Sequence, residues 1–147
     1  MKPNREWIIG VTHLIKPLFD PEKKAFRDNV RFIHFPDSDE REFSKDSLSE
    51  VDGLLVWTPS IGVQTIRHLA KCQIIVRYGV GYDQIDLSTL DNAGIAFSNN
   101  PEYGPEDVAD TAIGLILALQ RGLIQHDERA RTYGSTWQEN HIVPMLH

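Results

Sequence analysis

The sequence has one cysteine, no excess of basic residues and no long apolar run, and each shortage excludes a class of protein. A single cysteine, Cys72, cannot form a disulfide within this chain of 147 residues, and it favours a reducing compartment. A net charge of -6 argues against a nucleic-acid surface, which would need clustered Lys and Arg. The most apolar stretch, residues 108–119, is shorter than the roughly 20 residues that cross a membrane. The amino terminus lacks the apolar centre of a signal peptide, so we expect a cytoplasmic protein.

Histidine and cysteine provide no pattern for metal binding or nucleophilic catalysis. Cys72 has no neighbouring histidine in a supporting pattern, so we predict that it is a small core residue. No two histidines have metal-ligand spacing, and we therefore predict no metal site. The six histidines are His13, His34, His68, His126, His141 and His147.

Short apolar segments alternate with helical patterns along the first hundred residues. Such alternation is typical of a parallel sheet with right-handed crossover helices. We predict an α/β fold, a flavodoxin-like doubly wound parallel sheet of five strands in the order 2-1-3-4-5. The predicted strands cover residues 7–11, 30–35, 53–57, 74–78 and 95–98.

Helix-start signals lie between these strands. Asp20 is the candidate cap of a helix over residues 21–29, and Ser60 that of a helix whose buried stripe is Ile61, Ile66 and Leu69. Asp39 and Glu42 have capping-box spacing before a short helix that would bury Phe43 and Leu48. Ile85, Leu87 and Leu90 fit another short helix, which Asn92-Ala93-Gly94 closes with Gly94 as its stop.

The chain is organised around residues 74–86, where an apolar strand runs into a turn containing Gly79 and Gly81. Because the strand reads as apolar on both faces, we expect it to be buried. Without side chains at the two glycines, backbone amides there can converge on a small anion, most plausibly a carboxylate. The alternative is that both glycines serve only a tight strand-to-helix turn. The turn is not a dinucleotide fingerprint, because G-x-G-x-x-G would place glycine where Gln84 stands.

Charged residues around this turn allow two interpretations. Arg77 either lines a binding cleft or pairs with Asp83 or Asp86 for structural reasons alone. We interpret Asp83 as an acceptor that stabilises the turn rather than as a catalytic base.

The last third of the chain has a different character. Pro105 occupies a favoured first helical position and is followed by acids that suit a helix start. Apolar residues then recur at helical spacing on nearly every face, so the helix needs a partner, either another subunit or another domain. We predict a division into a sheet core over residues 1–104 and a long helix with a connector over residues 105–147.

Several runs in a fixed order resemble the D-isomer-specific 2-hydroxyacid dehydrogenases. The match spans about residues 51–137, and its runs are RYGVGYDQIDL at 77–87, AGI at 93–95, NP at 100–101 and EDVAD at 106–110. The family combines a substrate domain with an inserted NAD(P)-binding domain.

The resemblance implies roles for specific residues. The backbone around Gly79, Val80 and Gly81 would hold the substrate carboxylate, and Arg77 and Tyr78 would line the same cleft. The residues implied to face the nicotinamide are Asn100, Pro101 and Val108. The helix from Pro105 would be a hinge and subunit-contact helix, with a homodimer formed through residues 105–124.

The sequence also departs from the family. The family's cofactor fingerprint, its acidic ribose-binding residue and its catalytic arginine, glutamate and histidine all follow the position where this chain ends. His126 and His141 do not match the catalytic histidine, so no catalytic residue is assigned. We therefore expect the substrate-binding half of a shortened NAD(P)-dependent enzyme. Alone it should be inactive, bind no cofactor, and bind a small 2-hydroxy or 2-keto acid weakly.

Three other classes of protein differ from that expectation. A non-catalytic module that self-associates through the apolar helix remains open. A phosphoacceptor receiver domain needs acidic residues at the ends of the first and third strands, where Thr12-His13 and Thr58-Pro59 stand. A flavodoxin needs a hydroxyl-rich phosphate loop after Val11, and none follows.

Overall fold

The computed structural model describes residues 5–12, 20–26 and 29–133. The chain divides into two compact units, Met1–Tyr103 and Gly104–His147, each of which is considered by itself.

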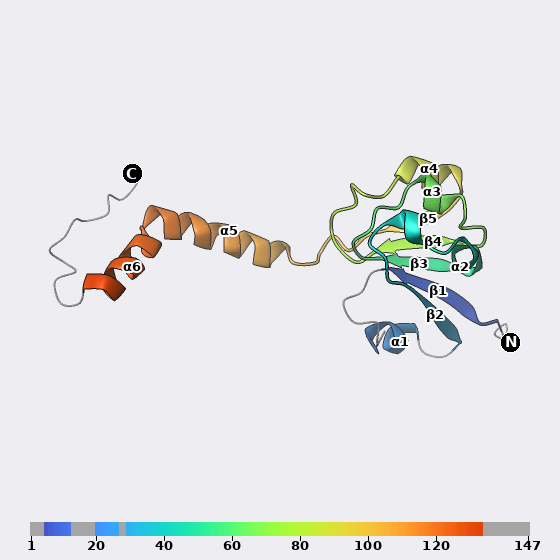
Figure 1. The fold of residues 1–147 in the computed structure, drawn as a ribbon, viewed down its shortest axis with the longest axis horizontal. Helices are drawn as coiled ribbons and strands as arrows, with labels where there is room; N and C mark the ends of the chain where they lie inside the picture. The colour runs from blue at the N-terminus through green and yellow to red at the C-terminus, as the bar shows by residue number, and fades with distance from the viewer. Residues whose placement is uncertain (1–4, 13–19, 27–28, 134–147) are drawn as a thin grey trace. The chain divides into compact units, whose positions relative to one another are not determined.

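The first unit is built on a parallel sheet (Figure 1). Its strand order is β2-β1-β3-β4-β5, and every described strand pair is parallel. The predicted α/β fold with a five-stranded parallel sheet is therefore confirmed. The strands are β1 (Trp7–Thr12), β2 (Val30–Phe35), β3 (Gly53–Val56), β4 (Ile74–Arg77) and β5 (Ala96–Ser98).

Short helices cover the sheet on both faces. In Figure 1, α1 (Asp20–Phe26) lies on one side of the sheet, and α3 (Val63–Ile66) and α4 (Leu87–Asn92) lie on the other. The remaining elements between strands are the 3-10 turn η1 (Glu40–Glu42) and α2 (Lys45–Glu50). Because all five strands run in one direction, their carboxyl ends share one edge of the sheet, which is where open α/β sheets bind ligands.

The core lies between the sheet and the helices. Leu54, Val56 and Ile75 on the central strands have no exposed surface. They form one cluster with Leu48 and Leu90 from the helices. In β4 only Ile75 is buried; Ile74 is 39% exposed, and Val76 and Arg77 are half-buried. The expectation that β4 is buried on both faces was therefore wrong for most of the strand.

Two predicted helix starts differ from the structure. Ser60 does not cap a helix; Ile61 stays extended and forms a parallel bridge with Ile85, and α3 begins after Gly62. Ile61, Ile66 and Leu69 are nevertheless all buried, as predicted.

The Asp39 signal begins a 3-10 turn rather than an α-helix. The Asp39 side chain accepts a hydrogen bond from the Arg41 amide, while Ser44 caps the separate helix α2. Phe43 and Leu48 are buried as predicted. Helix α1 is described over Asp20–Phe26, and the next two predicted helical residues, 27–28, lie outside the described residues. Asn29, the last residue of the predicted helix, is not helical and has a positive φ of 70°.

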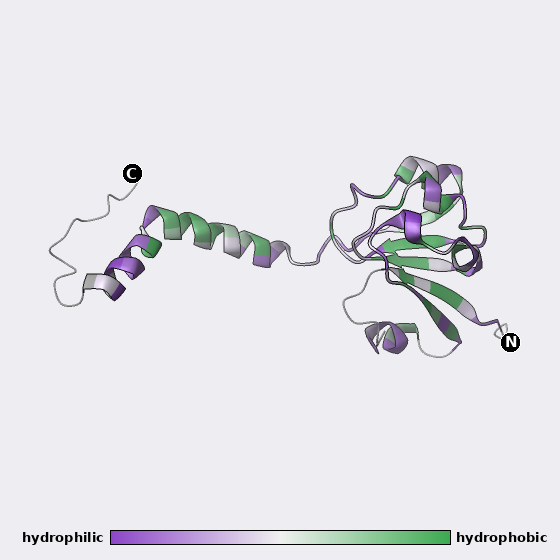
Figure 2. Cartoon of the chain, viewed as in Figure 1, coloured by the Kyte–Doolittle hydropathy of each residue, from purple (hydrophilic) through white to green (hydrophobic). Residues whose placement is uncertain are grey.

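The second unit holds two helices, α5 (Pro105–Gln120) and α6 (Leu123–Tyr133). Gly104 precedes α5 with φ 73°, and Gly122, with φ 59°, separates the helices. The predicted continuous apolar helix therefore breaks before Leu123. Figure 2 shows apolar residues along α5, and none of its side chains is buried. None of the described helices is long and apolar enough to cross a membrane.

Candidate functional site

The glycine turn leaves the sheet at its carboxyl edge. The Tyr78 amide still donates to the Val56 carbonyl (3.0 Å), continuing the ladder one residue past β4. On the neighbouring strands, the Trp57 amide donates to the Thr12 hydroxyl oxygen (3.0 Å). The glycine turn therefore begins at a sheet edge that hydrogen bonds hold in place.

The carbonyl groups of the turn are held, whereas its amides are not. The Asn100 amide donates to the Gly79 carbonyl (3.2 Å), and the Asn99 side-chain amide donates to the Val80 carbonyl (2.7 Å). Within the described residues, the amides of Gly79, Val80 and Gly81 donate to no acceptor. Three neighbouring donors are therefore free to bind a ligand or water.

Neither glycine is required by the backbone or by packing. Gly79 and Gly81 are not among the glycines with positive φ. A Cβ at Gly79 would meet nothing within 4 Å, and one at Gly81 only the Asp83 Oδ2 at 3.8 Å. The glycines therefore leave open space beside the amides, which favours the anion-binding interpretation over the tight-turn interpretation.

Arg77 brings a positive charge to the same edge. Its Nη1 donates weakly to the Val56 carbonyl (3.4 Å), and its Nε is buried without a hydrogen-bond partner among the described residues. In the same part of the chain, Arg77 forms no ion pair with Asp83 or Asp86. The purely structural pairing is therefore not seen. A half-buried arginine whose Nε has no partner among the described residues fits an anionic ligand nearby.

The predicted role of Asp83 belongs instead to Asp86. The Asp83 side chain accepts no hydrogen bond within the residues that the structure covers, whereas Asp86 accepts from the Thr89 amide (3.0 Å). The hydroxyls of Thr89 (2.6 Å) and Ser88 (2.7 Å) also donate to Asp86. These bonds, chiefly that of the Thr89 side chain, lower the pKa of Asp86 to about 2.

Tyr78 is held by a partner that sequence reasoning missed. Its hydroxyl donates to the Glu22 Oε1 (2.6 Å), and its ring meets that of Trp57 edge-on with centroids 5.8 Å apart. Burial, and secondarily Glu22, raises the pKa of Tyr78 far above its ordinary value. Glu22 lies 56 residues away on α1, and no local motif marks it.

The residues implied to face a nicotinamide are divided between the two units. Asn100 is joined to the turn by its amide, and Pro101 follows it on the exposed segment after β5. Val108 lies in α5 of the second unit, where it is 70% exposed.

The turn does not fit the phosphates of a dinucleotide. The helix that follows, α4, has its amino end capped by the Asp86 carboxylate, so the site where a pyrophosphate would bind already carries a negative charge. Gln84 in the fingerprint position likewise argues against a dinucleotide phosphate at the turn.

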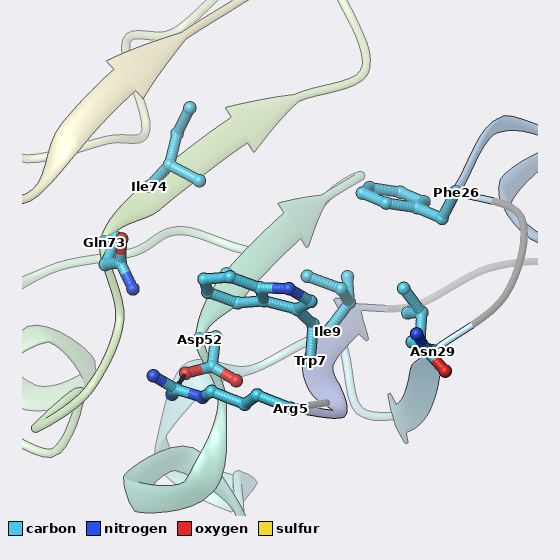
Figure 3. A pocket seen from close by; sticks show the side chains of 10 residues that line it. Arg5, Trp7, Ile9, Phe26, Asn29, Asp52, Gln73 and Ile74 are labelled. Carbon is cyan, nitrogen blue, oxygen red and sulfur yellow. Dashed lines mark hydrogen bonds and ion pairs between the residues drawn. The ribbon is translucent and has the colours of Figure 1, made fainter. Parts of the chain in front are cut away.

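A cavity of about 540 Å³ lies at the opposite edge of the sheet, where the strands begin (Figure 3). Trp7, Phe26 and Ile74 form its apolar walls. Arg5, whose guanidinium lies 4.9 Å from the Trp7 ring, pairs there with the buried Asp52. The cavity shares no lining residue with the glycine turn, and no sequence pattern indicated it.

Among the described residues, neither Cys72 nor a group of metal-ligating side chains forms a second site. Cys72 is buried, as predicted, and burial raises the pKa of its thiol to about 11. Over the described residues, no cluster of His, Cys, Asp and Glu could hold a metal ion.

Comparison with known proteins links this geometry to one family. Residues 12–142 match the model of the D-isomer specific 2-hydroxyacid dehydrogenase catalytic domain. A glyoxylate reductase of Pyrococcus horikoshii is 31% identical over 110 residues, which are 71% of this chain and 32% of the relative. A glyoxylate/hydroxypyruvate reductase of Arabidopsis thaliana is 45% identical over 69 residues, 47% of this chain and 22% of the relative.

Solved structures agree with the family match. An NADPH-dependent glyoxylate/hydroxypyruvate reductase from Sinorhizobium meliloti, in complex with NADP and malonate, has a TM-score of 0.70 and 27% identity. The similarity covers 95% of this chain and 42% of that one. The chain spans less than a third of the length of the two curated relatives above. By its match over residues 12–142, the chain belongs to the D-isomer specific 2-hydroxyacid dehydrogenase family.

Proposed function

We propose that this chain is the substrate-binding half of an NAD(P)-dependent D-2-hydroxyacid dehydrogenase and that Gly79, Val80 and Gly81 hold the substrate carboxylate. The observation that carries the proposal is the set of three turn amides with no acceptor in the described chain, above which the glycines leave open space. Hydrogen bonds to a charged acceptor are about twice as strong as neutral ones, so a carboxylate is the ligand that gains most there.

Arg77 and Tyr78 complete the proposed cleft. The unpartnered Nε of Arg77 supplies a positive charge near the turn. Tyr78 forms the wall on the α1 side, because its phenol is fixed by Glu22. Asn100, Pro101 and Val108 are proposed to face the nicotinamide. The Asn100 amide donates a hydrogen bond to the Gly79 carbonyl, which connects Asn100 to the glycine turn.

The proposed chemistry is the interconversion of a small 2-hydroxy acid and its 2-keto acid. NAD or NADP, when bound to the complete enzyme, supplies the hydride acceptor or donor. The residues of this chain bind the carboxylate and orient the reacting carbon. Hydride transfer also needs a positioned acid–base group, and no histidine here matches that role. The purified chain should therefore show no NAD(P)H turnover with glyoxylate or hydroxypyruvate, and measurable turnover would contradict this.

The binding step is tested by amide chemical shifts during titration with glycolate. We expect shifts at Gly79, Val80 and Gly81 in the wild type. Gly81→Val should abolish them, because its side chain would fill the open space without meeting backbone. Gly114→Ala, also at an open glycine but in α5, is the matched control and should leave them intact. Unchanged shifts in Gly81→Val would reject the site.

A second candidate function is self-association through residues 105–124. The observation favouring it is that large apolar side chains in this segment are more than half exposed, namely Val108, Ile113, Leu115, Ile116, Leu117, Leu119, Leu123 and Ile124. Burial of such a surface is a strong drive to form a homodimer.

Sedimentation across a wide concentration range tests this second function. We expect a dimer in the wild type and a monomer in Ile116→Glu, whereas Arg131→Glu on α6 should remain dimeric. A wild-type monomer at high concentration would reject self-association. It would leave the glycolate result untouched.

A further inference from the structure

Tyr78 is fixed from three directions. Its amide donates to the Val56 carbonyl (3.0 Å), its ring packs edge-on against Trp57, and its hydroxyl donates to Glu22 (2.6 Å). Glu22 is 9% exposed, so this carboxyl group is held in the protein rather than in water. A buried acid bonded to a residue directly beside the glycine turn is an unusual neighbour for an anion site.

The direction of the Tyr78–Glu22 bond limits what Tyr78 can offer a ligand. A phenol has one hydroxyl proton, and Tyr78 donates it in the hydrogen bond to Glu22. Toward a ligand, the phenolic oxygen can therefore act only as an acceptor, and the carboxylate behind it adds negative charge. The α1 side of the turn consequently favours hydrogen-bond donors and disfavours anions.

Charge is therefore distributed unequally around the turn. Arg77 and Tyr78 are consecutive residues at the end of β4, so their side chains leave on opposite faces of the sheet. This alternation directs the Arg77 side chain toward one face and the Tyr78 side chain, which donates to Glu22, toward the other. The free amides follow directly in sequence. A ligand that matches this arrangement has one carboxylate and a neutral donor such as a hydroxyl at its other end.

We propose that Glu22 is a positioning residue which, through Tyr78, makes the turn select hydroxy-monocarboxylates over dicarboxylates. The proposal rests on the carboxylate-binding function proposed above for the turn. Glu22 holds the Tyr78 ring in place and repels a second carboxylate, and it takes no part in the chemistry itself. It thereby narrows the substrate class to acids with a single negative charge.

The test compares two probes that differ in one group. Glycerate and tartronate share a 2-hydroxy acid end, but tartronate replaces the hydroxymethyl group of glycerate with a second carboxylate. We expect the wild type to bind glycerate roughly threefold to tenfold more tightly, as measured from the Gly79–Gly81 amide shifts at low salt. High salt should shrink this ratio only slightly, because Glu22 is buried and buried charges are screened much less than exposed ones.

Glu22→Gln isolates the charge, because the amide oxygen can still accept the Tyr78 proton. We expect the glycerate-to-tartronate ratio to approach one, mainly through tighter tartronate binding. Glu6→Gln changes the net charge equally at the opposite edge of the sheet and should keep the wild-type ratio. Tyr78→Phe, which removes the positioning bond, should weaken glycerate binding while Glu22 keeps its charge.

The outcomes separate the two proposals. An unchanged ratio in Glu22→Gln, or a wild-type preference for tartronate, overturns the role of Glu22 while leaving the carboxylate site in place. If neither probe shifts the turn amides of the wild type, the proposed function fails as well. Retained amide spectra in each variant establish that the fold is intact.

Discussion

The side-chain amide of Asn99 donates a hydrogen bond to the carbonyl oxygen of Val80 across 2.7 Å. This contact joins the segment after β5 to the turn after β4 and directs a carbonyl dipole toward the protein. The amides on either side are left without acceptors in the described chain. The polarity of the turn is thus fixed by a residue that lies 19 positions away.

Asn99→Ala should weaken glycolate binding several-fold, because the Val80 carbonyl would be free to rotate toward the ligand and repel it. Titration of the turn amides measures the change in Kd. Asn92→Ala, at the exposed end of α4, is the control and should bind like the wild type. Equal affinity in both variants would show that Asn99 does not orient the turn.

Glu22→Gln should lower the pKa of Tyr78, because the carboxylate both accepts its proton and opposes its negative charge. The pKa should stay above the ordinary value of 10.0, since burial is the larger cause and remains. Because the pKa of Tyr78 is higher in the folded than in the unfolded chain, the protonated Tyr78 stabilises the fold. This contribution to the free energy of unfolding is complete below pH 10 and is lost as the pH rises above it. Phenolate absorbance measures the titration, with Tyr78→Phe identifying the signal. Titration of wild-type Tyr78 together with exposed tyrosines would contradict the buried bond.

Asp86→Asn should lower the melting temperature at neutral pH. The difference in melting temperature between the variant and the wild type should disappear in acid. The pKa of Asp86 is about 2 in the folded chain, against an ordinary value of 3.8. The stabilisation is therefore present above pH 3.8 and is lost as pH falls toward 2. Asp83→Asn, in the same turn but without hydrogen bonds to its carboxylate in the described chain, is the matched control. A pH-independent deficit would point to a cause other than the carboxylate charge.

Gly10→Ala should destabilise the first unit by about 1–3 kcal/mol, the usual cost of overpacking a core. A Cβ there would lie 2.7 Å from the Leu54 Cδ1 and 2.8 Å from the Phe35 Cε2. Gly114→Ala in the open face of α5 should instead stabilise its helix by about 0.5–1 kcal/mol. Denaturant unfolding measures both, and a neutral Gly10→Ala would mean that β1 can shift freely within the sheet.

The sheet was predictable because its signals are local and repeated. Each strand is a short apolar run between turn residues, and parallel pairing follows from the intervening helices. The bounds of β2 and the positive φ of Gly94 also agree with the sequence pattern. Such features depend on neighbours along the chain, and the chain alone reveals them.

The misplaced helix start at Ser60 had a long-range cause. The carboxylate of Glu40 accepts hydrogen bonds from the Gly62 amide (2.8 Å) and from the Thr65 hydroxyl (2.6 Å). It thus satisfies the amino end of α3 from 22 residues away, a role that Ser60 was expected to fill. Pairing of Ile61 with Ile85 kept the preceding residues extended.

The candidate site divides in the same way. Gly79, Gly81 and Arg77 were visible from sequence because they form one continuous run. Glu22, Asn99 and the unpartnered Nε of Arg77 were not, because each depends on which segments the fold brings together. Residues that orient a site are harder to find than residues that line it.

Every described contact that shapes the glycine turn is made within Met1–Tyr103. Nothing in the geometry of its donors depends on the helices that begin at Pro105. If the turn binds small acids as proposed above, that binding belongs to the first unit alone. Fusion of a different domain at Gly104 should therefore leave binding of the acid unchanged.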